Sequence, residues 1–188
     1  MNAAEMVTAL KQKFGDAVLS TVEFRGEHTI NVTLACLKQF MRYCRDEMRF
    51  DYLVDVSSLD NLGEDPRFEM VYELYGYSHS QHLRVKAKVS EEESAPTVSD
   101  LWATAEWHER EVYDMMGIDF EGHPDLRRIL MWEGYPFFPL RKDFPLEGKP
   151  SDMPDVAFTG VAPMADGPFV TCAGGSDTIA REPRARNP

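Results

Sequence analysis

"QHLRVKAKVS" (Gln81–Ser90) is the stretch of this sequence that decides the fold. Apolar residues alternate in it with polar or charged ones, the apolar set being Leu83, Val85, Ala87 and Val89. A period of two predicts a β-strand with one face in the core and the other in water. A sheet built from such strands needs a cover of helices on one side only.

The residues before this strand supply the rest of that sheet and its cover. They predict, in order, helix 3–14 closed by Gly15, strands 17–24 and 28–35 joined as a hairpin through Gly26 and Glu27, helix 35–47, and strands 49–59 and 68–78. The apolar run "YLVDV" favours a place in the middle of the sheet for strand 49–59. The order α-β-β-α-β-β-β predicts an α+β fold, a two-layer domain with a mixed sheet and helices on one side.

A further helix follows the sheet, after the solvated loop "EEESAP" (91–96). Its apolar face comprises Val98, Leu101, Trp102, Ala105, Val112 and Met116. Gly117 is placed as its C-terminal cap, and a break is expected near Thr104. We therefore divide the chain into a sheet domain (1–90), a loop with this helix (91–117) and a long extended C-terminal arm (118–188).

The arm is rich in both prolines and aromatic rings up to residue 150. Such a composition predicts neither a helix nor a disordered linker, but a segment that buries its rings against another surface. Residues 151–188 are poorer in apolar groups and are expected to be a tail that orders on binding.

Charge and cysteine content exclude several classes of function. The formal net charge is −12, most of it in residues 1–121, which argues against nucleic-acid binding and against direct contact with anionic lipid. No signal peptide and no membrane span is expected, so we predict a soluble chain that something else would hold at any membrane. Three cysteines without close spacing cannot hold an iron–sulfur cluster, and Cys36 and Cys44 are expected to be core thiols on one helix.

The stretch "EWHEREVYDMMGIDFEGHPDLRRIL" (106–130) has the density of acids and histidines that catalytic sites show. No HExxH pair, nucleophile motif or glycine-rich cofactor fingerprint accompanies them, so we expect no catalytic, cofactor-binding or metal-binding residue in this chain. The spacing instead favours an ion-pair ladder, with Glu106–Arg110 and Arg110–Asp114 at i, i + 4. An acid–base enzyme using Glu111, Asp114 and His123 remains the alternative.

Basic residues near the aromatic rings of the arm allow two interpretations. Arg127, Arg128, Arg141 and Lys142 could form a solvated basic patch. We favour an interface, because guanidinium groups flanked by rings pair well with carboxylates of a partner. The predicted interface residues are Arg127, Arg128, Trp132, Pro139, Leu140, Arg141, Lys142 and Phe144.

At these residues the chain resembles the thirty-kilodalton (C) subunit of NADH-quinone oxidoreductase, respiratory complex I. The signature elements stand in register as Glu109-Arg110-Glu111, Asp114-Met115-Met116, His123, Arg127 and Ile129-Leu130. Seven residues are expected to be structural on this basis: Glu109, Arg110, Glu111, Asp114, Gly117, His123 and Pro124.

The resemblance implies a non-catalytic scaffold subunit of the peripheral arm of a proton-translocating enzyme. FMN, iron–sulfur clusters and quinone would be bound by partner subunits, and this chain would pack against the large quinone-site subunit and the iron–sulfur subunits. It would lie peripherally at the cytoplasmic side of the inner (plasma) membrane. The alternative is the equivalent subunit of a membrane-bound hydrogenase or another donor-dependent quinone oxidoreductase.

Overall fold

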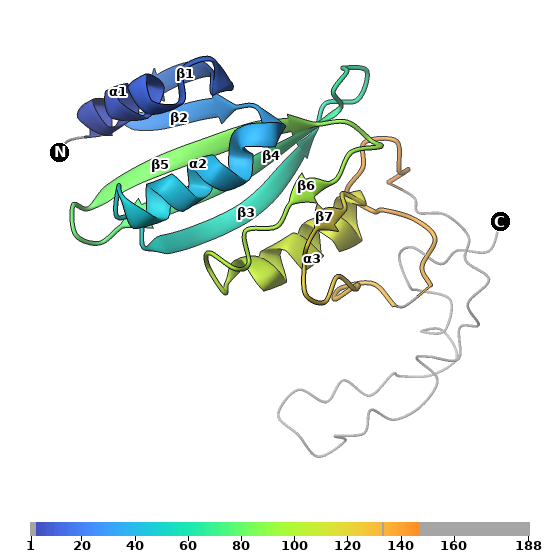
Figure 1. Ribbon diagram of the computed structural model, residues 1–188. Coiled ribbons are helices and arrows are strands. Elements are labelled where there is room, and N and C mark those ends of the chain that lie inside the picture. Colours follow the sequence, from blue (N-terminus) through green and yellow to red (C-terminus); the bar gives the residue numbers. More distant parts are fainter. Residues whose placement is uncertain (1–2, 133, 147–188) are drawn as a thin grey trace, which may run out of the picture. The chain divides into compact units, whose positions relative to one another are not determined.

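The structure, a computed structural model, describes residues 3–132 and 134–146. The chain divides into two compact units, Met1–Gly134 and Tyr135–Pro188. The first unit contains the helices α1 (Ala3–Phe14), α2 (Leu34–Asp46) and α3 (Ala105–Met116), with the 3-10 turn η1 (Gly15–Ala17) after α1. Its strands are β1 (Val18–Phe24), β2 (Glu27–Val32), β3 (Tyr52–Asp60), β4 (Phe68–Gly76), β5 (Gln81–Val89), β6 (Ala95–Pro96) and β7 (Phe120–Glu121). Figure 1 shows these elements.

The main sheet has the strand order β1-β2-β5-β4-β3. β2 and β5 run parallel, whereas the pairs β1–β2, β5–β4 and β4–β3 are antiparallel. The sheet is therefore mixed, and α1 and α2 lie over one of its faces (Figure 1). The predicted α+β class, its element order and its helices on one side are confirmed.

β5 lies at the centre of the sheet, and its predicted alternation is confirmed. Its apolar residues are buried, with Val85 fully so, among the apolar faces of α1 and α2. The opposite face carries cross-strand ion pairs, in which Arg84 meets Glu73 and Lys86 meets Glu69 at 2.8 Å. Arg84 lies directly opposite Glu73, and Lys86 lies diagonally across from Glu69; opposite charges in either arrangement stabilise the pairing of β4 with β5.

β3 lies at an edge of the sheet, so the prediction of a central place for it was wrong. Its "YLVDV" run is buried on one side only, and Tyr52 and Val54 remain 41% and 39% exposed. The burial that the sequence suggested comes from α3, which packs along β3 and shares its core. A strand that packs against a helix at the sheet edge needs apolar residues there, so its sequence resembles that of a central strand.

The cysteines of α2 behave as expected of core thiols. Cys44 is fully buried, and burial raises the pKa of its thiol well above the usual value. Cys36 is half-buried on the same helix and packs against the core. Cys172 and the predicted tail, 151–188, lie outside the described residues.

The first residues after α3 belong to the core of the sheet domain. Ile118 and Phe120 are 2% and 4% exposed within the same apolar cluster as β5, and β7 pairs in parallel with β6. Phe120 falls in the predicted arm (118–188), so the expectation that the arm buries its rings against another surface was wrong for this ring. Among the described residues, no helix combines the length and apolar character that crossing a membrane requires.

Candidate functional site

α3 is the element around which the signature residues gather. It begins at Ala105, so the break expected near Thr104 is the start of the helix. Gly117 ends it in the left-handed region, at φ 72°, and its N–H donates to the Tyr113 carbonyl at 2.9 Å. The predicted glycine cap is confirmed, and it turns the chain back along the helix.

Glu109 connects α3 to the segment before it. The carboxylate is fully buried and accepts hydrogen bonds from the Val98 N–H, at 2.7 Å, and from the Thr97 hydroxyl. Burial raises the pKa of Glu109 to about 7, although both hydrogen bonds act to lower it. Lys38 donates to the Thr97 carbonyl and to Asp100, which brings α2 to the same loop.

Asp114 connects the same helix to the segment after it. Its Oδ2 atom accepts the backbone N–H groups of Ile129, Leu130 and Met131 at 3.0, 2.6 and 2.8 Å. Arg128 adds a charged hydrogen bond at 2.7 Å to Oδ1, and a second at 3.0 Å to the Asp114 carbonyl. Burial acts to raise the pKa of Asp114, but these donors outweigh it and hold the pKa below its usual value.

His123 supplies a third connection, between the turn after β7 and the helix. Its side chain is buried, its Nε2 atom lies 3.0 Å from the Glu106 carbonyl, and Nδ1 accepts the Asp125 N–H at 3.1 Å. Because Nδ1 accepts, the proton of the neutral ring sits on Nε2 and is donated to Glu106. The Glu109 carboxylate lies 3.9 Å from Nε2.

These three connections hold the loops on either side of α3 to it. The predicted i, i + 4 ladder was wrong in its pairing, because the described part of the chain has no ion pair between Arg110 and either Glu106 or Asp114. Asp114 turns instead toward backbone N–H groups of a segment distant in sequence, and Glu109 does the same on the other side of the helix. The N–H groups of Val98 and of 129–131 were missed, since a backbone donor leaves no mark in a sequence. The Thr97 hydroxyl was missed because the loop brings it to Glu109 from 12 residues away.

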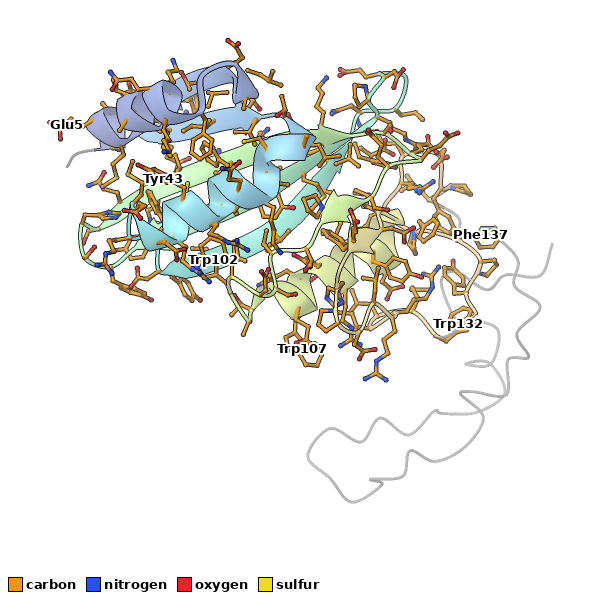
Figure 2. All side chains as sticks on the ribbon, viewed as in Figure 1. Glu5, Tyr43, Trp102, Trp107, Trp132 and Phe137 are labelled. Carbon is orange, nitrogen blue, oxygen red and sulfur yellow. The ribbon has the colours of Figure 1, made fainter. Side chains whose placement is uncertain are left out.

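A cleft of about 670 Å³ lies between α3 and the segment that Asp114 holds. It is lined by Trp107, Arg110, Tyr113, Leu126, Arg127, Arg128, Ile129 and Gly134. Arg110 is 5% exposed, and its guanidinium lies 4.9 Å from the centre of the Trp107 ring. Trp107 is 61% exposed and projects from α3 away from the sheet (Figure 2). The i, i + 3 spacing of these two residues was the available signal for their contact.

The other predicted residues of this unit have differing surroundings. Glu111 and Pro124 are exposed, and Trp132 is half-buried. Arg127 pairs with Asp125 at 2.9 Å while remaining 70% exposed. Arg128 pairs with Asp114 of its own chain, and its contact with another subunit stays a prediction.

Residues 135–146 belong to the second unit. Arg141 stacks its guanidinium on the Phe138 ring at 4.6 Å, and the rings of Phe137 and Phe144 lie 6.0 Å apart. Leu140 and Lys142 are exposed, and Pro139 is half-buried. Basic groups stacked on rings are suited to an interface, which stays a prediction for these residues.

Metal-binding groups and the lining of the cleft bear on which chemistry the described residues can support. No group of three or more His, Cys, Asp or Glu side chains in 3–132 and 134–146 is placed to hold a metal ion. The cleft combines an exposed indole with guanidinium groups, which are the side chains that protein interfaces favour.

The fold and the site together define an α+β domain with a mixed five-stranded sheet and a basic, aromatic cleft beside its third helix. Residues 30–150 match the family described as respiratory-chain NADH dehydrogenase, 30 Kd subunit. The chain belongs to this family.

Curated relatives agree with this membership. The C subunit of NADH-quinone oxidoreductase from Geotalea uraniireducens is 46% identical over 143 residues, covering 76% of this chain and 87% of the relative. The second C subunit of NADH-quinone oxidoreductase from Rhizobium meliloti is 42% identical over 165 residues, covering 80% and 91%. A chain of the membrane-bound sulfane sulfur reductase, an archaeal respiratory membrane complex, has the same fold with a TM-score of 0.67 at 23% identity, covering 76% of this chain and 85% of that one.

Proposed function

We propose that this chain is a scaffold subunit, without catalytic residues of its own, in the peripheral arm of a proton-translocating NADH-quinone oxidoreductase. One observation carries the proposal. Glu109, Asp114 and His123, which have the residue types for acid–base chemistry, have buried side chains engaged by this chain's own loops. Groups held in this way stabilise a surface and are closed to a substrate.

The scaffold works through its partners. FMN, iron–sulfur clusters and quinone are bound by other subunits in this proposal, and the chain packs against the quinone-site and iron–sulfur subunits. It is held at the cytoplasmic side of the inner membrane by the complex. The names of the relatives, which are subunits of NADH-quinone oxidoreductase, support this assignment.

The test is to purify the complex from membranes through a tag on this chain. Arg128→Ala should lower the amount of assembled complex, because it leaves the buried Asp114 carboxylate without its guanidinium partner. NADH-dependent quinone reduction per assembled complex should stay unchanged. Normal assembly with lost turnover would contradict the scaffold assignment.

Glu111→Gln provides the matched control on the same helix. Glu111 is exposed, so its neutralisation should leave the fold of the chain and the turnover per assembled complex unchanged. The alternative of an acid–base enzyme requires the opposite, with turnover abolished in a fully assembled complex.

A second assignment remains open because the same fold occurs in an archaeal respiratory membrane complex with different chemistry. The chain would then serve the equivalent place in a hydrogenase or another donor-dependent oxidoreductase. Electron-donor specificity of the purified complex separates the two. Reduction of quinone by NADH supports the first assignment, and activity with another donor in its place supports the second.

A further inference from the structure

We propose that the cleft beside α3 binds a carboxylate side chain of a neighbouring subunit through Arg110, with Trp107 packing over the contact. This inference rests on the proposed function, since it requires that the chain sits in a complex. It assigns the contact to a residue that the sequence had placed in an internal ladder.

Arg110 is a buried cation with an incomplete set of partners. Its Nε atom donates to the Arg127 carbonyl at 3.2 Å, and its Cζ atom lies over the Trp107 ring, 4.9 Å from the ring centre. Among the described residues, no carboxylate pairs with it. A guanidinium has five N–H donors, so the terminal nitrogen atoms remain available where the side chain lines the cleft.

A comparison of the arginines that line the cleft also points to Arg110. Three arginines line it, and two have a carboxylate within this chain, Arg128 with Asp114 and Arg127 with Asp125. Arg110 is the third, and it is the most buried of the three. An uncompensated buried charge is unfavourable, and a carboxylate entering the cleft would offset it with a forked hydrogen bond.

The surroundings favour a protein as the source of that carboxylate. Trp107 presents a large exposed ring directly beside the guanidinium, and Leu126 and Ile129 add apolar groups to the lining of the cleft. Such a ring is suited to an anchor that excludes water from a neighbouring charged pair. A protein surface offers the acid together with apolar groups that cover the ring.

Zero-length cross-linking in the purified complex tests the contact directly. The Arg110→Lys variant places an amine in the cleft, and a water-soluble carbodiimide activates any carboxylate beside it. The amine attacks the activated carbonyl, an amide bond forms and the urea leaves. Peptide mass spectrometry should find residue 110 joined to an Asp or Glu of another subunit. A cross-link to an acid of this chain, or none in an assembled complex, would overturn the proposal.

The exchange of labelled for unlabelled chain gives a second measurement that does not depend on cross-linking. Labelled chain in the purified complex is challenged with an excess of unlabelled wild type, and its release is followed. Removing one member of a buried interfacial pair should speed release by about 30-fold or more for Arg110→Ala. Trp107→Ala, at an exposed position outside the core, should also speed release while leaving the thermal midpoint of the free chain unchanged.

Arg42→Ala is the matched control for both variants. Arg42 lies on α2, is 56% exposed and pairs with Asp100 at 3.6 Å, outside the cleft. Its loss should change the release rate by no more than about twofold. Equal release of all variants and wild type would overturn the carboxylate contact while leaving the scaffold assignment intact. Absence of the wild-type chain from the complex would instead refute the proposed function itself.

Discussion

Glu109 and Asp114 lie on one helix and are both fully buried, yet the pKa values of their carboxyl groups shift in opposite directions. Burial acts to raise both. Glu109 receives one backbone N–H and one hydroxyl, so burial prevails. Asp114 receives three backbone N–H groups and a guanidinium, so the donors prevail. The number of donors supplied by the loops therefore decides the direction in which the pKa of each acid shifts.

The raised pKa of Glu109 makes the stability of the full chain depend on pH. An unfolded Glu titrates near about 4.3, whereas the folded pKa is about 7. Between these values the folded state holds a proton that the unfolded state has released. The free energy of unfolding should therefore fall as pH rises through this window, by at most about 1.4 kcal/mol per pH unit, and level off above it.

Glu109→Gln tests this by removing the titration while keeping an amide of similar shape. Urea unfolding of the full-length chain at several pH values between about 4.5 and 8 should give a flatter profile for the variant. Lys38, Asp100 and His123 also face this site, so the comparison is made with Glu111→Gln on the same background. If Glu111→Gln flattened the profile equally, Glu109 would not be its source.

At the scale of elements, α3 must end sharply, because Asp114 can bind the N–H groups of residues 129–131 only if the chain reverses direction after the helix. Gly117 provides that end in the left-handed region, where a side chain is strained. Gly117→Ala should lower the free energy of unfolding by about 1 kcal/mol in urea titration. Gly117→Asn should cost less, because asparagine tolerates the left-handed region better than alanine. An alanine variant as stable as wild type would show that the turn can form in another conformation.

The parts of this fold that the sequence predicts well are those set by neighbours along the chain. The alternation in β5, the helical faces of α1 and α2 and the cap at Gly117 follow from local periodicity and backbone preference. The edge position of β3 could not be predicted, because it depends on β5 crossing over to pair with β2. The partners of Glu109 and Asp114 were hidden for the same reason, since they are backbone N–H groups and side chains that loops bring in from distant parts of the sequence.

At the scale of the whole molecule, the apolar cluster of the described residues lies in the first unit, and the second unit follows it in the sequence. The apolar cluster extends from Met6 to Phe120, with Leu126 packed against it, and the donors to Asp114 end at Met131. All of these lie within Met1–Gly134. The predicted interface residues from Pro139 to Phe144 belong to the second unit.

Two truncated chains test this separation. A chain ending at Gly134 keeps the cluster and every described donor to Asp114, so it should unfold cooperatively with a thermal midpoint within a few degrees of full length. A chain ending at Glu121 keeps almost the whole cluster but loses Arg128 and the three N–H donors, leaving a buried carboxylate unpaired. It should be less stable by about 3–5 kcal/mol, measured by urea unfolding.

Incorporation into the complex then tests what the remaining residues do. The chain ending at Gly134 should fold but be depleted from purified complex, because the predicted interface residues beyond it are absent. Full incorporation of that chain would place the whole attachment on the first unit, with the Arg110 cleft as its principal contact. Equal stability of the two truncated chains would show instead that the segment held by Asp114 adds little to the fold, whatever its part in assembly.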